Sequence, residues 1–85
     1  MTYQIEFSRQ AARQFRNLPS QIQQRLKSRI DSLAAMPRPH GSEKLSGADQ
    51  LYRIRVGDYR IVYAVEDNRL FVLVVKVGHR REVYR

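Results

Sequence analysis

The sequence predicts a small α+β domain with the element order β-α-α-β-β-β. Three observations support this class: residues 3–7 alternate apolar and polar side chains, two stretches of helical spacing follow, and the period-two alternation returns from Leu51 onward. Consecutive strands joined by short turns form an antiparallel meander, and two helices can cover one face of such a sheet. We therefore expect one domain over residues 1–85, with a helical pair on one sheet face and a basic opposite face.

The first helix is predicted between Ser8 and Pro19. Ser8 ends the opening strand, and its hydroxyl can cap the helix that follows. Apolar side chains then recur at helical spacing at Ala11, Ala12, Phe15 and Leu18.

The second helix is predicted from Ser20 to about Met36. Ser20 and Gln23 have the spacing of a capping box, and proline at position 37 prevents the helix from continuing. One apolar stripe of this helix contains Ile22, Leu26, Ile30 and Leu33. Residues 37–49, which contain a second proline and two glycines, are expected to form a loop.

The rest of the chain is predicted to form three strands. Residues 57–58 favour a two-residue hairpin turn, and residues 67–68 indicate a second turn. The run at residues 70–75 is apolar on both faces, which is typical of a central strand.

The first of these turns fixes the register of the two strands that it joins. Arg55 then lies opposite Arg60, and Arg53 shares their face, while the apolar side chains of the hairpin share the other face. Like charges directly opposed in a sheet destabilise it, and a phosphate bound among the three arginines would offset that repulsion. The alternative is a solvated cationic face with Asp58 or Glu66 as a partial counter-ion.

The composition also indicates an anionic counterpart. The 85 residues contain 16 Lys and Arg against 8 Asp and Glu, a formal net charge of +8, and all of these cations except Lys27, Lys44 and Lys76 are arginines. A planar guanidinium binds two phosphate oxygens at once, so phosphate is the expected partner. The alternative is a charge that only keeps a small domain soluble.

Several classes of protein are excluded or disfavoured. The chain has no cysteine, which excludes disulfides and thiol nucleophiles, and its two histidines have no carboxylate cluster beside them. We therefore expect no metal and no cofactor. No apolar run approaches the ~20 residues that span a bilayer, and the N-terminus lacks a signal-peptide pattern, so we expect a cytoplasmic protein with no membrane partner.

The C-terminal residues add titratable groups to the arginines. His79, Arg80, Arg81 and Tyr84 follow the last predicted strand within a few positions. Cleavage of an RNA strand by its own 2′-OH needs charge neutralisation, an orienting group and proton carriers, but no metal. The combined inventory therefore favours a metal-independent endoribonuclease.

Two motifs carry a resemblance to a known family. The segment from Tyr52 to Tyr63 (YRIRVGDYRIVY), together with Val77-Gly78-His79-Arg80 and Glu82-Val83-Tyr84, resembles the RelE family of type II toxin–antitoxin toxins. The resemblance implies an endoribonuclease that enters the ribosomal A site, cuts translated mRNA by 2′-OH attack and is neutralised by a cognate antitoxin. An acidic or amphipathic antitoxin segment would suit the basic surface.

The resemblance also implies which residues form the site. The family's catalytic positions correspond to Arg53, Arg55, Arg60, Arg80 and Tyr84. The best-known members have lysine where this chain has Arg53 and Arg55, and an arginine is a poor proton carrier. We therefore expect His79 to act as the general acid, because histidine is the side chain whose ordinary pKa suits proton transfer at neutral pH. The expected RNA-binding set comprises Arg53, Arg55, Arg60, Arg80, Arg81 and Lys44.

Two other functions fit the same chain. One is a toxin similar to ParE, which shares the fold and inhibits DNA gyrase without nuclease activity. The other is a plain RNA-binding module, which would bind phosphates on the basic face without cutting.

Overall fold

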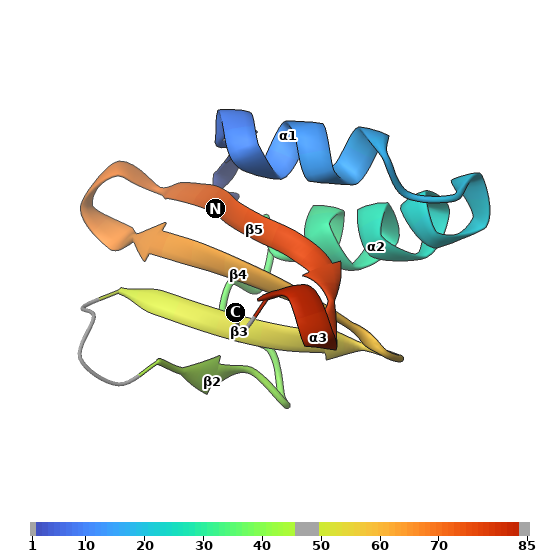
Figure 1. Cartoon of the computed structure of the whole chain (residues 1–85). Helices are drawn as coiled ribbons and strands as arrows, with labels where there is room; N and C mark the ends of the chain where they lie inside the picture. The colour runs from blue at the N-terminus through green and yellow to red at the C-terminus, as the bar shows by residue number, and fades with distance from the viewer. Residues whose placement is uncertain (1, 46–49, 84–85) are drawn as a thin grey trace.

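The computed structural model describes residues 2–45 and 50–83 (Figure 1). Along the chain, its elements are β1 (Gln4–Phe7), α1 (Arg9–Arg16), α2 (Ser20–Ser32), β2 (Glu43–Lys44), β3 (Leu51–Val56), β4 (Tyr59–Glu66), the 3-10 turn η1 (Asp67–Arg69), β5 (Phe71–His79) and α3 (Arg80–Val83). The strands form one five-stranded sheet in the order β1-β5-β4-β3-β2. The predicted α+β class and the order of its main elements are confirmed.

The sheet is mixed rather than purely antiparallel. Strands β3, β4 and β5 form the predicted antiparallel meander. Strand β1, however, pairs in parallel with β5, with Gln4 opposite Phe71 and Phe7 opposite Val74. In the sequence, α1 and α2 separate β1 from the meander. The intervening chain is long enough for β1 and β5 to lie side by side and pair in parallel at the edge of the sheet.

The register of the β3–β4 hairpin agrees with the prediction at every pair. Arg55 lies opposite Arg60, Tyr52 lies opposite Tyr63, and the turn is at residues 57–58. Gly57 has a φ of 63°, a left-handed conformation that glycine adopts without strain. A two-residue turn of this kind leaves no freedom to shift the pairing.

The β4–β5 pairing contains one irregularity that the sequence pattern does not reveal. Val62 pairs with Lys76, whereas Tyr63 pairs with Val74, so Val75 is an extra residue in β5. This is a β-bulge. Because side chains alternate between the two faces of a strand, the extra residue moves every later side chain of β5 to the opposite face.

Helix α1 begins as predicted. The hydroxyl oxygen of Ser8 accepts a hydrogen bond from the backbone N–H of Ala11 at 3.0 Å, which satisfies one of the free donors of the first turn. The same hydroxyl donates to the carbonyl of Val75 at 3.0 Å. Ser8 therefore caps the helix and also ties it to the bulge of β5.

Helix α2 begins at Ser20 as predicted, but its capping and its C-terminal end differ from the prediction. Pro19 is its N-cap residue and no side chain caps it, because Gln23 instead donates to the carbonyls of Leu18 and Arg16. The helix ends at Ser32 and residues 33–35 form turns, since the residue before a proline avoids the helical conformation and the chain must leave the helix before Pro37. None of the helices that the structure describes is long and apolar enough to cross a membrane.

The expected loop at residues 37–49 contains the short strand β2, whose Glu43 pairs with Arg53 of β3. The loop is anchored by Arg38, which donates two hydrogen bonds to the Asp67 carboxylate, at 3.1 and 2.8 Å. Arg38 also donates to the Tyr52 hydroxyl at 2.8 Å. A sequence pattern shows the prolines of this segment but not the partners that fix it to the sheet.

The hydrophobic core lies between the α1–α2 pair and one face of the sheet. It comprises Ala11, Leu26, Ile30 and Leu33 from the helical segments and Ile54, Ile61, Tyr63, Val65, Val72, Val74 and Val77 from the strands. The predicted apolar stripe of the second helix is therefore largely core, with Ile22 packed against its border.

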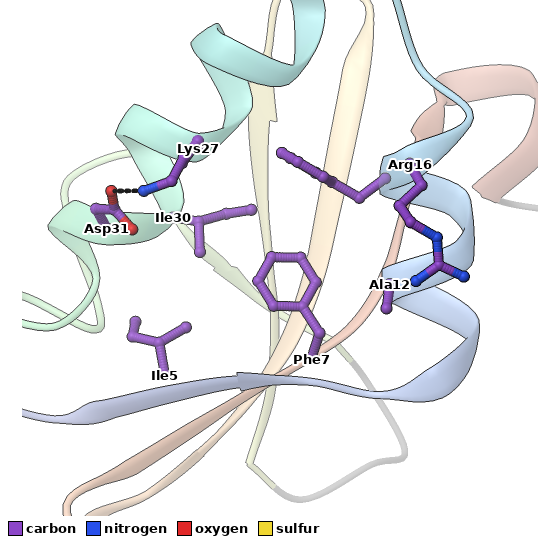
Figure 2. A pocket seen from close by; sticks show the side chains of 8 residues that line it. Ile5, Phe7, Ala12, Arg16, Lys27, Ile30 and Asp31 are labelled. Atoms are coloured by element: carbon purple, nitrogen blue, oxygen red, sulfur yellow. Dashed lines mark hydrogen bonds and ion pairs between the residues drawn. The ribbon is translucent and has the colours of Figure 1, made fainter. Parts of the chain in front are cut away.

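A hollow of about 410 Å³ opens at the edge of this core, between β1, α1 and α2 (Figure 2). Phe7 of β1 is 37% exposed, and its ring lies edge-on to that of Phe15, with the ring centroids 5.6 Å apart. Lys27 and Asp31 of α2 form an ion pair of 2.8 Å beside the hollow. The helix-covered side of the sheet thus presents apolar surface to solvent at β1.

Candidate functional site

The side of the sheet opposite α1 and α2 carries a cluster of cationic side chains. It comprises Arg53, Arg55, Arg60 and Lys76, and we call it the arginine face. Residues directly paired in a sheet share a face, and the pairing places all four on the side away from Ile54 and Ile61 of the core. The three arginines that the sequence brings together therefore do lie together.

Lys76 was not among the predicted site residues. It reaches the arginine face because the bulge at Val75 reverses the alternation of β5, which pairs Lys76 with Val62. Without that bulge, Lys76 would face the helices. No feature of the apolar run at residues 70–75 marks the position of the extra residue, so sequence patterning cannot find this lysine.

Arg55 is the cation of this face that is most available to a ligand. Its side chain is exposed, and it makes no hydrogen bond or ion pair with any residue that the structure describes. Arg53 is only 19% exposed and pairs with the carboxylate of Glu43 on the neighbouring strand. The two arginines of β3 therefore differ: Arg53 has an acidic neighbour, whereas Arg55 presents an unneutralised guanidinium.

Arg60 lies on the predicted face but is buried. Only 6% of it is exposed, and its Nη1 donates to the carbonyls of Tyr59 and Gly57 at 3.2 and 3.4 Å. Its Nε is buried and has no hydrogen-bond partner among the residues that the structure describes. A buried donor of a charged group that makes no hydrogen bond costs free energy, so the burial of Arg60 lowers the stability of the fold.

Helix α3 lies on the same side of the sheet as Arg60. It crosses in front of β4, whereas α1 and α2 lie on the other side (Figure 1), and it contacts both β4 and β5. Its first residue, Arg80, has an exposed side chain, and its backbone N–H donates to the Asp58 carbonyl at 2.9 Å. The arginine face is therefore partly covered by α3 (Figure 1).

His79 does not lie with the arginines. It pairs with Tyr59, so its ring is on the helix-covered side, edge-on to the Tyr59 ring with 5.6 Å between the ring centroids. The cause is again the bulge at Val75, since simple alternation along β5 would have placed His79 on the arginine face. The sheet thus separates this imidazole from Arg55 and Arg60.

The remaining candidates are scattered. Lys44 pairs with Tyr52, so it belongs to the helix-covered side at the edge strand β2 and is exposed. Arg81 is exposed in α3, and its backbone N–H donates to His79 Nδ1 at 3.3 Å. Tyr84 lies outside the described residues.

The perturbed pKa values occur away from the arginine face. Hydrogen bonds from Arg38, and then from Tyr3, hold the pKa of the Asp67 carboxyl below its usual range. Burial raises the pKa of Tyr63 to about 12, and its hydroxyl donates to the Pro37 carbonyl at 2.8 Å. Both groups fasten the 37–42 loop to the sheet, so we assign them a structural role.

The arginine face supplies positive charge rather than proton transfer. A guanidinium stays protonated in proteins and presents a planar set of N–H donors that match phosphate oxygens. Within the part of the chain that the structure describes, no cluster of three or more histidine, aspartate or glutamate side chains could hold a metal ion. Binding of an anionic backbone is the chemistry for which these residues are suited.

Comparison with known proteins places the chain in a family. Residues 5–84 match the model of the ParE toxin of the type II toxin–antitoxin system parDE. The mRNA interferase toxin RelE of Escherichia coli K12 is 34% identical over 88 residues, which covers 99% of this chain and 92% of the relative. The chain belongs to the RelE/ParE superfamily of type II toxins.

Solved RelE structures have the same fold as this superfamily member. A chain of the archaeal RelE–RelB complex from Pyrococcus horikoshii superimposes with a TM-score of 0.83 at 30% identity, covering 96% of this chain and 99% of the other. A free E. coli RelE variant gives a TM-score of 0.83 at 33% identity, with coverages of 99% and 92%. The RelE-like fold expected from the sequence is confirmed.

Proposed function

We propose that the protein is a toxin that cuts translated mRNA in the ribosomal A site, in the cytoplasm, without a metal. The observation that carries this proposal is Arg55, an exposed guanidinium with no acidic partner among the described residues, placed beside Arg53 and Arg60. A relative that is 34% identical is named an mRNA interferase, which supports the same activity.

The chemistry starts from the substrate's own nucleophile. The ribose 2′-OH attacks the adjacent phosphorus and the bond to the 5′-oxygen breaks, so the products end in a 2′,3′-cyclic phosphate and a 5′-OH. Arg55 and Arg53 hold the phosphate oxygens, and Arg60 stabilises the charge that develops on them in the transition state. Arg80, at the start of α3, provides a further positive charge.

Proton transfer is assigned to Tyr84 on the resemblance alone. The 2′-OH must lose a proton and the departing 5′-oxygen must gain one. The arginines cannot exchange protons, and His79 lies across the sheet from them. We therefore leave His79 outside the proposed catalytic set.

A cognate antitoxin is the proposed regulatory partner. RelE is bound to RelB in the intact E. coli RelBE complex, one of whose chains has a TM-score of 0.81 and 32% identity to this chain, covering 91% of this chain and 95% of the other. For this protein we propose an acidic or amphipathic segment that lies across the arginine face. Expression of the native operon should yield a co-purifying partner, and isolation of the toxin alone would contradict this.

The activity is tested by mapping mRNA 5′ ends in a purified translation reaction. The unaltered protein should create new ends within codons only when the message is translated. Arg55→Ala should reduce cutting by ~10²-fold, whereas the control Arg9→Ala, which removes the same charge from α1, should cut normally. Equal cutting by both variants would remove Arg55 from the site.

The match to the ParE model favours a second candidate, a toxin that inhibits DNA gyrase without cutting RNA. A supercoiling assay with purified gyrase separates the two. Inhibition of supercoiling together with intact mRNA in the translation reaction would establish the ParE-like function instead.

A further inference from the structure

A small polar pocket lies between the end of α1 and the end of the β4–β5 pair. It has a volume of about 290 Å³, and its lining includes Gln14, Asn17, Leu18, Tyr59 and His79. This volume is close to the lower end of the ~300–1,000 Å³ typical of small-ligand sites, so it suits one ring system better than a longer chain. We call it the α1 pocket.

The pocket is built by interactions that join the helix to the sheet. The side-chain oxygen of Gln14 accepts a hydrogen bond from the backbone N–H of Val77 at 2.9 Å. This bond orients the carboxamide and leaves its amino group without a partner among the described residues. Asn17, at the C-cap of α1, adds a second carboxamide whose side chain makes no hydrogen bond with a described residue.

Two rings complete the wall. Tyr59 and His79 are nearly perpendicular, at 78°, and are cross-strand partners. His79 Nδ1 accepts the backbone N–H of Arg81, so a neutral His79 carries its proton on Nε2 and presents a donor there. The pocket therefore combines ring surfaces with hydrogen-bond donors and acceptors.

This combination fits an unpaired nucleobase. Proteins that read single-stranded RNA stack bases on tyrosine and histidine rings and hydrogen-bond the base edges. A carboxamide offers a donor and an acceptor side by side, which match the donors and acceptors on the edge of a base. A phosphate, whose oxygens only accept, would not need the carboxamide oxygen. The chemistry of the α1 pocket is thus different from that of the arginine face.

The pocket and the arginine face lie at the same end of the sheet. Tyr59 and His79 form one pair, and in the next pair, Arg60 and Gly78, the side chain of Arg60 lies on the other face. Several cations lie near this end of the sheet. Arg80 and Arg81 follow His79 in the sequence. Arg25 lies beside the turn, since one of its guanidinium nitrogens is 3.0 Å from the position that a Cβ would occupy at Gly57. Asp58 adds a single carboxylate at this turn, so positive charge prevails.

We propose that the α1 pocket receives an unpaired nucleobase of the RNA strand whose phosphates bind the arginine face. The proposal rests on the proposed ribonuclease function and assigns part of its sequence preference to Asn17, Gln14 and the Tyr59–His79 rings. The strand would pass around the end of β4 and β5, with a base next to the bound phosphates entering the pocket.

Binding is tested with 2′-O-methyl RNA trinucleotides, which cannot be cut because the nucleophilic hydroxyl is blocked. NMR spectra should show shifts at the amides of residues 14, 17, 18 and 79, in addition to shifts in β3 and β4. Asn17→Ala should remove the first set and keep the second. The matched control, Asn68→Ala, changes an exposed asparagine at the opposite end of the sheet and should keep both.

Shifts in β3 and β4 without any at the pocket would overturn the nucleobase proposal while leaving the ribonuclease proposal intact. The absence of shifts anywhere on the protein would also overturn the nucleobase proposal, and the mapping of mRNA ends in the translation reaction would then decide the ribonuclease proposal separately. The two experiments together therefore separate failure of the pocket from failure of the proposed function.

Sequence preference supplies a second readout. In the translation reaction, Asn17→Ala should change the relative cutting of sites that differ in one base by about tenfold, and Asn68→Ala should not change it. A loss that is uniform across all sites would contradict base recognition at the pocket.

Discussion

Arg55 and Arg60 lie directly opposite each other on β3 and β4, with both side chains on the arginine face. Arg55 is exposed, whereas Arg60 is 6% exposed and has a buried Nε with no partner in the described part of the chain. Two like charges in this position, one of them desolvated, destabilise the sheet. Proteins retain such costs where function requires them, which is the reason that this pair lies at the centre of the proposed site.

Arg60→Met should therefore stabilise the fold while abolishing activity. Methionine fills similar space without a charge or an unsatisfied donor, and we expect a gain of about 1 kcal/mol or more in the free energy of unfolding. Cutting should fall by ~10²–10³-fold. Urea unfolding and the translation reaction measure the two effects, and a destabilised variant would show that Arg60 supports the fold through contacts of its own.

Arg55→Ala should change the salt dependence of RNA binding. Each phosphate neutralised on a single strand contributes about 0.7 to the slope of log affinity against log salt concentration, so losing one contact should reduce the slope by about that amount. Titration of uncleavable 2′-O-methyl RNA at several salt concentrations gives the slope. Arg9→Ala is the control, and an equal reduction in both variants would indicate non-specific attraction.

His79→Ala should leave the shape of the pH–rate profile unchanged between pH ~5 and ~8, the range in which a histidine would change charge. The reason is geometric, since His79 lies with Tyr59 on the helix-covered side of the sheet. Single-turnover cleavage across this range is the measurement. A profile that flattens in the variant would return His79 to the catalytic set.

Tyr63 should make the fold sensitive to alkali. Its pKa is raised from 10.0 to about 12 by burial, so the native state holds the proton more tightly than the unfolded state does. The contribution of Tyr63 to stability is then fully present below pH ~10 and is lost as the pH rises towards about 12.

Tyr63→Phe should unfold more easily at neutral pH by about 1 kcal/mol, because it loses the hydrogen bond to the Pro37 carbonyl, but its stability should fall less steeply at alkaline pH. Tyr59→Phe is the control, and an unchanged alkaline slope in Tyr63→Phe would refute this role.

Asp67 should contribute to the acid limb of stability. Arg38 and Tyr3 lower the pKa of its carboxyl, so its contribution is present above the unfolded value of ~3.9 and disappears as the pH falls through the lower folded value. Asp67→Asn should reduce stability at neutral pH and flatten the acid limb. Unfolding midpoints measured between pH ~5 and ~2 test this, and parallel curves for the two proteins would argue against it.

Local patterns predicted the hairpin because its register depends on local features only. Residues 57–58 form a two-residue turn, and that turn determines every pair from Tyr52–Tyr63 to Val56–Tyr59. The three arginines were placed on one face for the same reason. Ser8 was likewise predicted as a cap because its partner is three residues away.

Features that depend on distant contacts were not predictable. The bulge at Val75 lies within an apolar run where every register buries similar side chains, yet it decides the faces of Lys76 and His79. The position of α3 against β4 and β5 could not be predicted, and the anchoring of the 37–42 loop depends on Asp67, far along the chain. The Ser20–Gln23 pattern failed because Gln23 found backbone carbonyls on the preceding turn.

The parallel pairing of β1 with β5 also has a consequence for the order of folding. The first strand finds its partner only in the last, with Gln4 opposite Phe71, and contacts between residues so far apart in sequence form slowly. A ribosome that makes this toxin must release β5 before the sheet can close. The β3–β4 hairpin, which carries Arg53, Arg55 and Arg60, can form from local contacts before then, so the growing chain displays these cations before it gains the β1–β5 edge.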